Sequence, residues 1–128
     1  MHDRNDMKDP NPPEILNQQS VTIIRLGEDY ASSFGNLLKD LAFIQQLAQS
    51  VTPPRLVVDL TNVKFIGSAF IGFMVTVYKT ITSRESGRFA LCGLNSFCQS
   101  AISISKLQDR FEIFETVDEA VQAFSADL

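Results

Sequence analysis

The chain has 128 residues, of which 45% are hydrophobic, and this length and composition fit one domain with a core of ordinary size. Its formal net charge of -4 and the lack of a Lys/Arg cluster argue against nucleic-acid binding. No apolar run approaches the roughly 20 residues that span a bilayer, and the N-terminal segment lacks the apolar stretch of a secretory signal, so we expect a cytoplasmic protein without a membrane anchor.

The first 19 residues are rich in Asp, Asn and Pro. Pro10, Pro12 and Pro13 disfavour both helix and strand, which predicts a flexible tail over residues 1–19 and a folded domain over residues 20–128. An arm that orders on a partner is the functional alternative to a loose tail. Ile15 and Leu16 are the positions at which contact with the sheet could begin.

The segment from Val21 to Leu26 predicts a strand, which Gly27 ends, and its partial alternation favours an edge position. Ser32 or Ser33 could then cap a helix. The apolar residues of that helix recur at helical spacing and form a stripe for the core: Phe34, Leu37, Leu38, Leu41, Ile44, Leu47 and Ala48. Pro53 and Pro54 follow it and predict the end of the helix.

The run Leu56–Val58, ending at Asp59, has the pattern of a strand buried on both faces, which predicts a central parallel strand. A short polar connection follows it, and Ser68 comes just before a helix. The apolar residues of this helix share one face: Ile71, Met74, Val75, Tyr78 and Ile81. Open α/β sheets place ligands and partners outside the carboxyl ends of their strands, so Ser68 is predicted to lie at the working edge.

The remaining elements continue the alternation of strands and helices. Gly87 is a candidate left-handed residue at the end of the second helix, and Arg88–Cys92 predicts the next strand. Asn95 or Ser96 could cap a third helix reaching toward Ile104 and Leu107, and a short apolar segment covers residues 111–114. Thr116, with Glu119 three residues later, forms an approximate capping box before the last helix. This order predicts an α/β fold with right-handed parallel crossovers.

The residues that catalysis would require are missing from the pattern. The single histidine, His2, lies in the predicted tail and cannot activate Ser68, Cys92 or Cys98 as a nucleophile. Cys92 and Cys98 do not form a CxxC motif, so two buried free thiols are favoured over a metal or redox pair. We therefore expect a protein that is not an enzyme and that uses no metal and no other cofactor.

The stretch DLTNVKFIGSAFIGF resembles the STAS domain family of bacterial anti-sigma-factor antagonists, and the resemblance extends from Val21 to Phe124. The family pattern is roughly V-x-D-L-x-x-V-x-F-I-D-S-[ST]-G-x-x-x-L. The residues at matching positions are Asp59, Leu60, Val63, Phe65, Ile66, Ser68 and Gly72. The resemblance implies a small STAS-like sandwich, with a mixed, mostly parallel sheet of about four to five strands and helices packed against it.

The resemblance also implies a function in regulation. Family members dock the helix start around the serine onto an anti-sigma factor that is also a serine kinase, and phosphorylation of the serine breaks the complex. Ser68 stands at that acceptor position. The partner-binding residues that the resemblance implies surround it: Asn62, Lys64, Gly67, Ser68, Ala69, Phe70 and Gly72.

Three residues depart from the family pattern, with Gly67 in place of Asp, Ala69 in place of Ser or Thr, and Phe70 in place of Gly. Phe70 could turn into the core or serve as an exposed anchor for a partner. Ser68 could act as the N-cap of its helix as well as a phosphorylation site. Lys64 and Asn62 could contact a partner or be solvated turn residues.

Two other functions remain open. The chain could be a constitutive interaction module of a signalling assembly, which Gly67 and Ala69 favour. It could also be a sensor of a nucleotide or small anion, because the N-terminus of a helix attracts anions. The sequence does not determine the oligomeric state or the identity of the partner.

Overall fold

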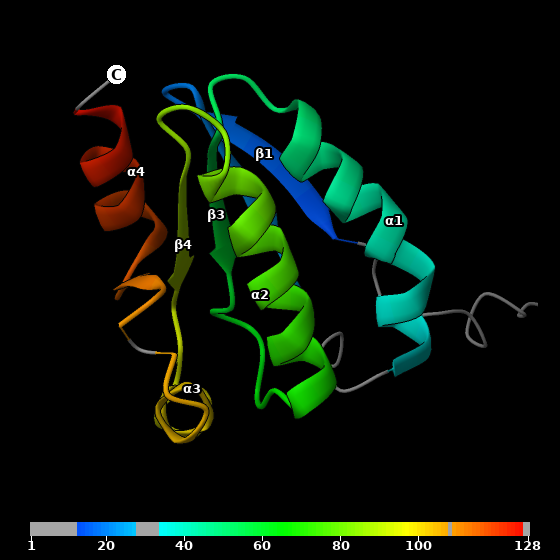
Figure 1. Ribbon diagram of the computed structural model, residues 1–128. Coiled ribbons are helices and arrows are strands. Elements are labelled where there is room, and N and C mark those ends of the chain that lie inside the picture. The colour runs from blue at the N-terminus through cyan, green and yellow to red at the C-terminus, as the bar shows by residue number, and fades with distance from the viewer. Residues whose placement is uncertain (1–12, 28–33, 108, 127–128) are drawn as a thin grey trace, which may run out of the picture.

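The structure, a computed structural model, describes residues 13–27, 34–107 and 109–126. A five-stranded sheet in the order β1-β2-β3-β4-β5 forms its centre (Figure 1). The elements in chain order are β1 Glu14–Gln18, β2 Val21–Arg25, α1 Phe34–Ser50, β3 Arg55–Asp59, α2 Ser68–Thr82, β4 Arg88–Cys92, α3 Ser96–Ile104, β5 Glu112–Phe114 and α4 Val117–Ser125. Only the β1–β2 pair is antiparallel among these strands, so the predicted mixed, mostly parallel α/β sheet is confirmed.

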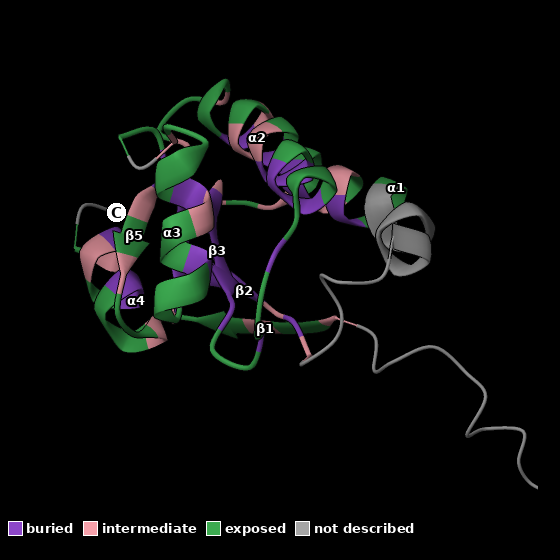
Figure 2. Cartoon of the chain, turned by 90° about the horizontal axis from the view of Figure 1, so that it is seen from below, coloured by how far each residue is buried: buried purple, intermediate pink, exposed green. Residues whose placement is uncertain are grey.

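The sheet lies between two layers of helices. α1 and α2 pack side by side on one face, whereas α4 covers the other face (Figures 1 and 2). Side chains of β3 point alternately to the two faces of the sheet. Leu56 and Val58 therefore join the apolar cluster beneath α1 and α2, while Val57 joins the cluster beneath α4. All five residues of β3 are buried, as the sequence predicts for a central strand.

The flexible-tail prediction is wrong for residues 14–18, which form β1. A two-residue turn at Gln19 and Ser20 connects β1 to β2, and both residues have positive φ angles, of 50° and 68°. Such a turn usually carries Asn or Gly, so its sequence gave no signal. β2 is consequently flanked by β1 and β3, and the edge position predicted for it is also wrong. Residues 1–12 of the predicted tail lie outside the described residues.

Two of the predicted helix N-caps are confirmed. Asn95 caps α3 and Thr116 caps α4, each accepting a hydrogen bond from the third helical N–H. Glu119 accepts a bond from the N–H of Glu115 at 3.2 Å, completing a variant of the predicted capping box. The predicted cap at Ser32 or Ser33 lies outside the described residues.

Gly87 does not have the predicted left-handed conformation. α2 ends at Thr82, and the residue with positive φ in the following turn is Ser86, at 65°. Gly87 is required for a different reason, since a Cβ there would lie 1.8 Å from the carbonyl oxygen of Ile81. The backbone of the turn therefore passes too close to the end of α2 for any side chain.

Candidate functional site

Ser68 is the first residue of α2 and is exposed at the carboxyl edge of the sheet, where the sequence predicts the working surface. The predicted role of Ser68 as N-cap is wrong. Gly67 occupies the N-cap position with an extended backbone, and its carbonyl accepts the first helical bond from the N–H of Ile71 at 3.0 Å. The serine hydroxyl is thus not used as the helix cap, and the first turn has no side-chain cap.

The loop from β3 to Ser68 is held by its own apolar residues. Val63 and Ile66 are buried, and the N–H of Val63 bonds to the carbonyl oxygen of Leu60 at 3.0 Å. Asn62 and Lys64 stand on either side of Val63 in the sequence and are exposed. This pattern of buried and exposed residues determines which loop side chains reach solvent, because the opposite orientation of the loop would expose the apolar side chains of Val63 and Ile66 to water.

The start of α3 binds the same loop. The Asn95 side-chain amide donates to the carbonyl oxygen of Lys64 at 2.8 Å and to that of Val63 at 3.4 Å. Its oxygen accepts the N–H of Cys98 at 2.8 Å, so one side chain caps α3 and holds the loop. Sequence analysis predicted the cap but not the contact with the loop, which depends on residues more than 30 positions away.

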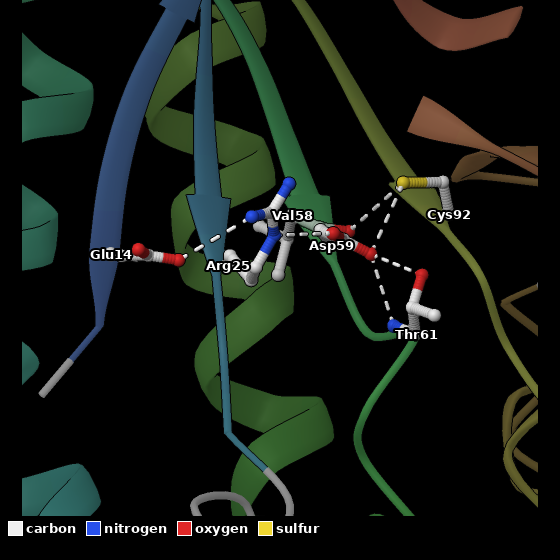
Figure 3. A network of polar contacts seen from close by, with 6 residues as sticks. All are labelled: Glu14, Arg25, Val58, Asp59, Thr61 and Cys92. Carbon is white, nitrogen blue, oxygen red and sulfur yellow. Dashed lines mark hydrogen bonds and ion pairs between the residues drawn. The ribbon is translucent and has the colours of Figure 1, made fainter. Parts of the chain in front are cut away.

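A buried carboxylate, Asp59, organises the end of β3 (Figure 3). One of its oxygens accepts Nε of Arg25 at 3.0 Å, and the other accepts the N–H and the hydroxyl of Thr61 at 3.0 and 2.6 Å. The hydrogen bond with Asp59 raises the pKa of Arg25 above its ordinary value. Sequence reasoning did not identify this role, although an Asp two residues before a Thr at a strand end is a typical turn signal.

Both cysteines are buried free thiols, as predicted. Burial, with a smaller contribution from the Asp59 charge, raises the pKa of Cys92 to about 12. Burial also raises the pKa of Cys98. Because the thiolate is the reactive form, these environments keep both side chains in the unreactive thiol form near neutral pH.

Phe70 lies in the core, with 1% of its surface exposed. The alternative that made it an exposed anchor for a partner is therefore wrong. The buried face of α2 is wider than the predicted stripe and also includes Phe73 and Val77. Only Phe70 among the predicted partner-binding residues is buried.

The other predicted partner-binding residues are exposed along the loop and the start of α2, and one further exposed residue, which the sequence analysis missed, lies among them. Phe65 is half exposed, and its ring lies 6.3 Å from that of Phe97, centroid to centroid. We call this surface the Ser68 face, and it consists of the exposed residues Asn62, Lys64, Phe65, Gly67, Ser68, Ala69 and Gly72. The sequence gives no signal for the exposure of Phe65, because its place between Val63 and Ile66 does not determine which way its side chain points.

A shallow hollow of about 470 Å³ lies beside this face, between the start of α3 and the start of α4. The residues that line it include Thr61, Gly93, Gln99, Phe114 and Thr116. None of its lining side chains is basic. Across the residues that the structure describes, three potential metal-ligating side chains nowhere gather into a group, and no helix is long and apolar enough to cross a membrane.

Comparison with known proteins gives a consistent picture. The model of the STAS domain matches residues 13–120. An anti-sigma-factor antagonist (STAS) domain protein from Planctomyces limnophilus has a similar structure, with a TM-score of 0.81 and 23% identity over 88% of this chain and 97% of that one. An anti-sigma factor antagonist from Mycobacterium paratuberculosis gives a TM-score of 0.73 and 19% identity over 88% and 92% of the two chains.

A third similar structure is the anti-sigma factor antagonist SpoIIAA in its unphosphorylated form. Its TM-score is 0.66, with 10% identity over 91% of this chain and 99% of that one. At these identities the structural similarities establish the shared fold.

Proposed function

The chain belongs to the STAS domain family, and from this premise we propose that it is an anti-sigma factor antagonist that binds an anti-sigma factor with serine-kinase activity through the Ser68 face. In this proposal the chain is a binding module without catalysis of its own, and the kinase partner switches it off by phosphorylating Ser68.

The observation that carries the proposal is the position of Ser68. Its side chain is exposed at the first residue of a 15-residue helix whose N-cap is a glycine, so the hydroxyl is not committed to capping. The loop before it is held by Asp59 and Asn95, which keeps the site in one geometry for a partner or a kinase. Preorganisation of this kind lowers the entropy cost of binding.

Phosphorylation at this position would act mainly on binding. A phosphate adds about -1.5 to -2 charge at neutral pH, and the N-terminus of a helix stabilises negative charge. The folded domain would therefore tolerate the modification. A partner surface that fits the neutral serine would bind the phosphorylated form more weakly. Binding would either remove water from the phosphate or bring it close to like charges of the partner.

The experiment uses the anti-sigma factors of the source organism that carry a serine-kinase domain, each purified and incubated with the chain and ATP. Phosphorylated residues are then mapped by mass spectrometry, with Ser68→Ala as the control. We expect phosphate on Ser68 and none on the Ser68→Ala variant. Phosphate at other residues only, or no phosphate with any of these kinases, would contradict the switch.

A constitutive interaction module is the second candidate, because Gly67 and Ala69 replace the family's Asp and Ser or Thr beside the acceptor. The variant Gly67→Asp separates the two candidates. A Cβ at Gly67 meets nothing within 4 Å, and the extended backbone there suits any residue, so the substitution requires no change of the loop backbone. If wild type binds an anti-sigma factor but only Gly67→Asp is phosphorylated, the constitutive function is supported and the switch is excluded for the natural sequence.

A further inference from the structure

We infer that the outer edge of β1 is a dimerisation surface for a second copy of this chain, paired antiparallel with the two Leu16 residues opposite each other. The pairing joins two five-stranded sheets into one continuous sheet. The inference is independent of the proposed function, because no residue of the Ser68 face takes part in the pairing.

The first observation is the direction of the backbone groups of β1. No other strand among the described residues pairs with its outer side. The two-residue turn after β1 makes Gln18 and Val21 a hydrogen-bonded pair. Bonded and non-bonded pairs alternate along an antiparallel ladder, so Leu16 also bonds to β2 whereas Ile15 and Asn17 do not. The backbone N–H and C=O groups of Ile15 and Asn17 therefore point outward.

The spacing of these outward groups is self-complementary. When a second β1 lies antiparallel with Leu16 opposite Leu16, Ile15 of each copy stands opposite Asn17 of the other, and each outward N–H meets an outward C=O. A register centred on Ile15 would place Asn17 opposite Pro13, which has no N–H. A register centred on Asn17 would place Ile15 opposite Gln19, which lies in the turn. Of these symmetric registers, only the one centred on Leu16 uses all of the outward groups.

The strand β1 lacks the features with which proteins usually block a sheet edge. Its five residues include no lysine and no proline, and all of them pair with β2 without a bulge. Its one charged residue, Glu14, would stand opposite Gln18 of the second copy, so no like charges meet. The sequence before β1 disfavours a further strand from the same chain, because Pro10, Pro12 and Pro13 provide no N–H for a ladder.

Exposed apolar side chains lie beside this edge on one face of the sheet. α1 is the outer helix on that face, on the side of β1 (Figure 1). Gln45 donates to the hydroxyl of Thr80 on α2, and Phe43 lies about 200° around α1 from Gln45, so Phe43 faces away from α2. Phe43 is 50% exposed. Ile15 is 41% exposed on the same face of the sheet, because it pairs with Ile24 of the cluster beneath α1 and α2.

This side of α1 suits a second copy of itself. A hollow of about 390 Å³ lies beside Phe43 and is also lined by Leu47 and Ser50. Residues 42–50 carry no charge, so two copies of a chain with net charge -4 can approach here without like charges in contact. The antiparallel pairing places both α1 helices on the same face of the joined sheet, on either side of the two-fold axis. Strand and helix therefore complement their own copies across one axis.

The dimer separates the two Ser68 faces. Because the second β1 is antiparallel to the first, the β3 strands of the two copies run in opposite directions. The Ser68 faces follow the carboxyl ends of β3 and consequently lie at opposite ends of the joined sheet. Each copy can therefore bind a partner while paired, and Ser68→Asp should leave dimerisation unchanged.

The test is sedimentation equilibrium of the full chain, which measures the dissociation constant of the dimer. Ile15→Lys places a charge at the edge, and Asn17→Pro removes an outward N–H without removing a bond to β2. Ile113→Lys is the matched control, because Ile113 is 37% exposed on β5 at the opposite edge of the sheet. Circular dichroism melting of each variant checks that the fold is kept.

We expect wild type to dimerise, and Ile15→Lys and Asn17→Pro each to raise the dissociation constant about tenfold or more, because each change acts twice in a symmetric dimer. Ile113→Lys should leave it unchanged. Phe43→Ser should also raise it, whereas Phe97→Ser, on α3, should not. A wild type that stays monomeric up to its solubility limit would overturn the inference, as would a dimer that both edge variants leave intact.

The variant Leu16→Cys tests the register. Residues opposite each other in a non-bonded antiparallel pair have Cα atoms about 4.5 Å apart, which permits a disulfide. The oxidant diamide should therefore cross-link Leu16→Cys between chains, but not Glu14→Cys, while the buried thiols of Cys92 and Cys98 stay reduced. A dimer without this cross-link would contradict the register. If the chain dimerises as expected but binds no anti-sigma factor, the proposed function fails and this inference stands.

Discussion

The side chain of Asn95 donates a 2.8 Å hydrogen bond to the backbone carbonyl of Lys64, which joins the first turn of α3 to the loop that presents Ser68. The same side chain caps α3 through its oxygen. A residue whose apparent role is local therefore also fixes the geometry of the candidate site, and the two roles can be separated by substitution.

Asn95→Asp should keep the cap and lose the donor to the loop, whereas Asn95→Ala should lose both. We expect Asn95→Ala to lower the free energy of unfolding by about 1–2 kcal/mol, and Asn95→Asp to cost less. Urea unfolding measures both values. Hydrogen exchange of the loop amides should accelerate in both variants, and exchange that stays at the wild-type rate in Asn95→Asp would show that the Lys64 contact does not hold the loop.

Asp59→Asn tests the buried carboxylate at the end of β3. The amide removes the buried charged partner of Arg25 and leaves only the exposed contact with Glu14, and we expect a loss of about 1–3 kcal/mol, moderated because the Arg25 side chain is 38% exposed and can be hydrated. The measurement is urea unfolding at neutral pH. Glu14→Gln is the control, because it removes only the exposed 3.5 Å contact with Arg25 and should cost less than about 0.5 kcal/mol. Equal losses for the two variants would contradict the central role of Asp59.

The alternation of apolar and polar residues predicted most of this fold. β3 was identifiable because its centre, Leu56–Val58, is a continuous apolar run, and the caps at Asn95 and Thr116 were identifiable because they depend on neighbours three residues away. β1 was missed because a strand at the edge buries little and its turn, Gln19-Ser20, has no glycine or asparagine. Local pattern identified these caps, although it placed the N-cap of α2 and the left-handed residue after it one position too late.

The candidate site was less predictable because several of its determining contacts join residues that are far apart in the sequence. The position of Ser68 followed from the strand and helix on either side of it. The burial of Phe70 and the exposure of Phe65 depend on how the loop crosses the sheet edge, which neither residue's neighbours specify. The pairing of Arg25 with Asp59 joins residues 34 positions apart, and sequence spacing carries no information about it.

Substitution by alanine should change the stability of the chain in opposite directions at two glycines. Gly87→Ala places a Cβ against the Ile81 carbonyl, so we expect a loss of more than about 1 kcal/mol. Gly72 lies inside α2, where a Cβ meets nothing within 4 Å, and Gly72→Ala should stabilise the chain by about 0.5–1 kcal/mol. Thermal melting compares them. A destabilising Gly72→Ala would contradict the exposed position of this residue.

The stability of the chain should fall as the pH rises above about 8.5, where the Cys92 thiol ionises in the unfolded state. In the folded state its pKa is about 12, so only the unfolded state releases the proton between these values. The loss is at most about 1.4 kcal/mol per pH unit for one thiol. Cys92→Ala should show a shallower alkaline slope in urea unfolding, and parallel slopes for the variant and wild type would contradict the buried environment of this thiol.

The most direct test of the account is the affinity of wild type and Ser68→Asp for the anti-sigma factor that binds the wild-type chain. Ser68→Ala is the control, since it removes the hydroxyl without adding charge. We expect Ser68→Asp to bind about tenfold more weakly or worse, with a melting temperature within a few degrees of wild type, because a carboxylate in the first helical turn is favourable. Ser68→Ala should bind like wild type. Equal affinity of wild type and Ser68→Asp would contradict the claim that Ser68 lies at the centre of the docking surface.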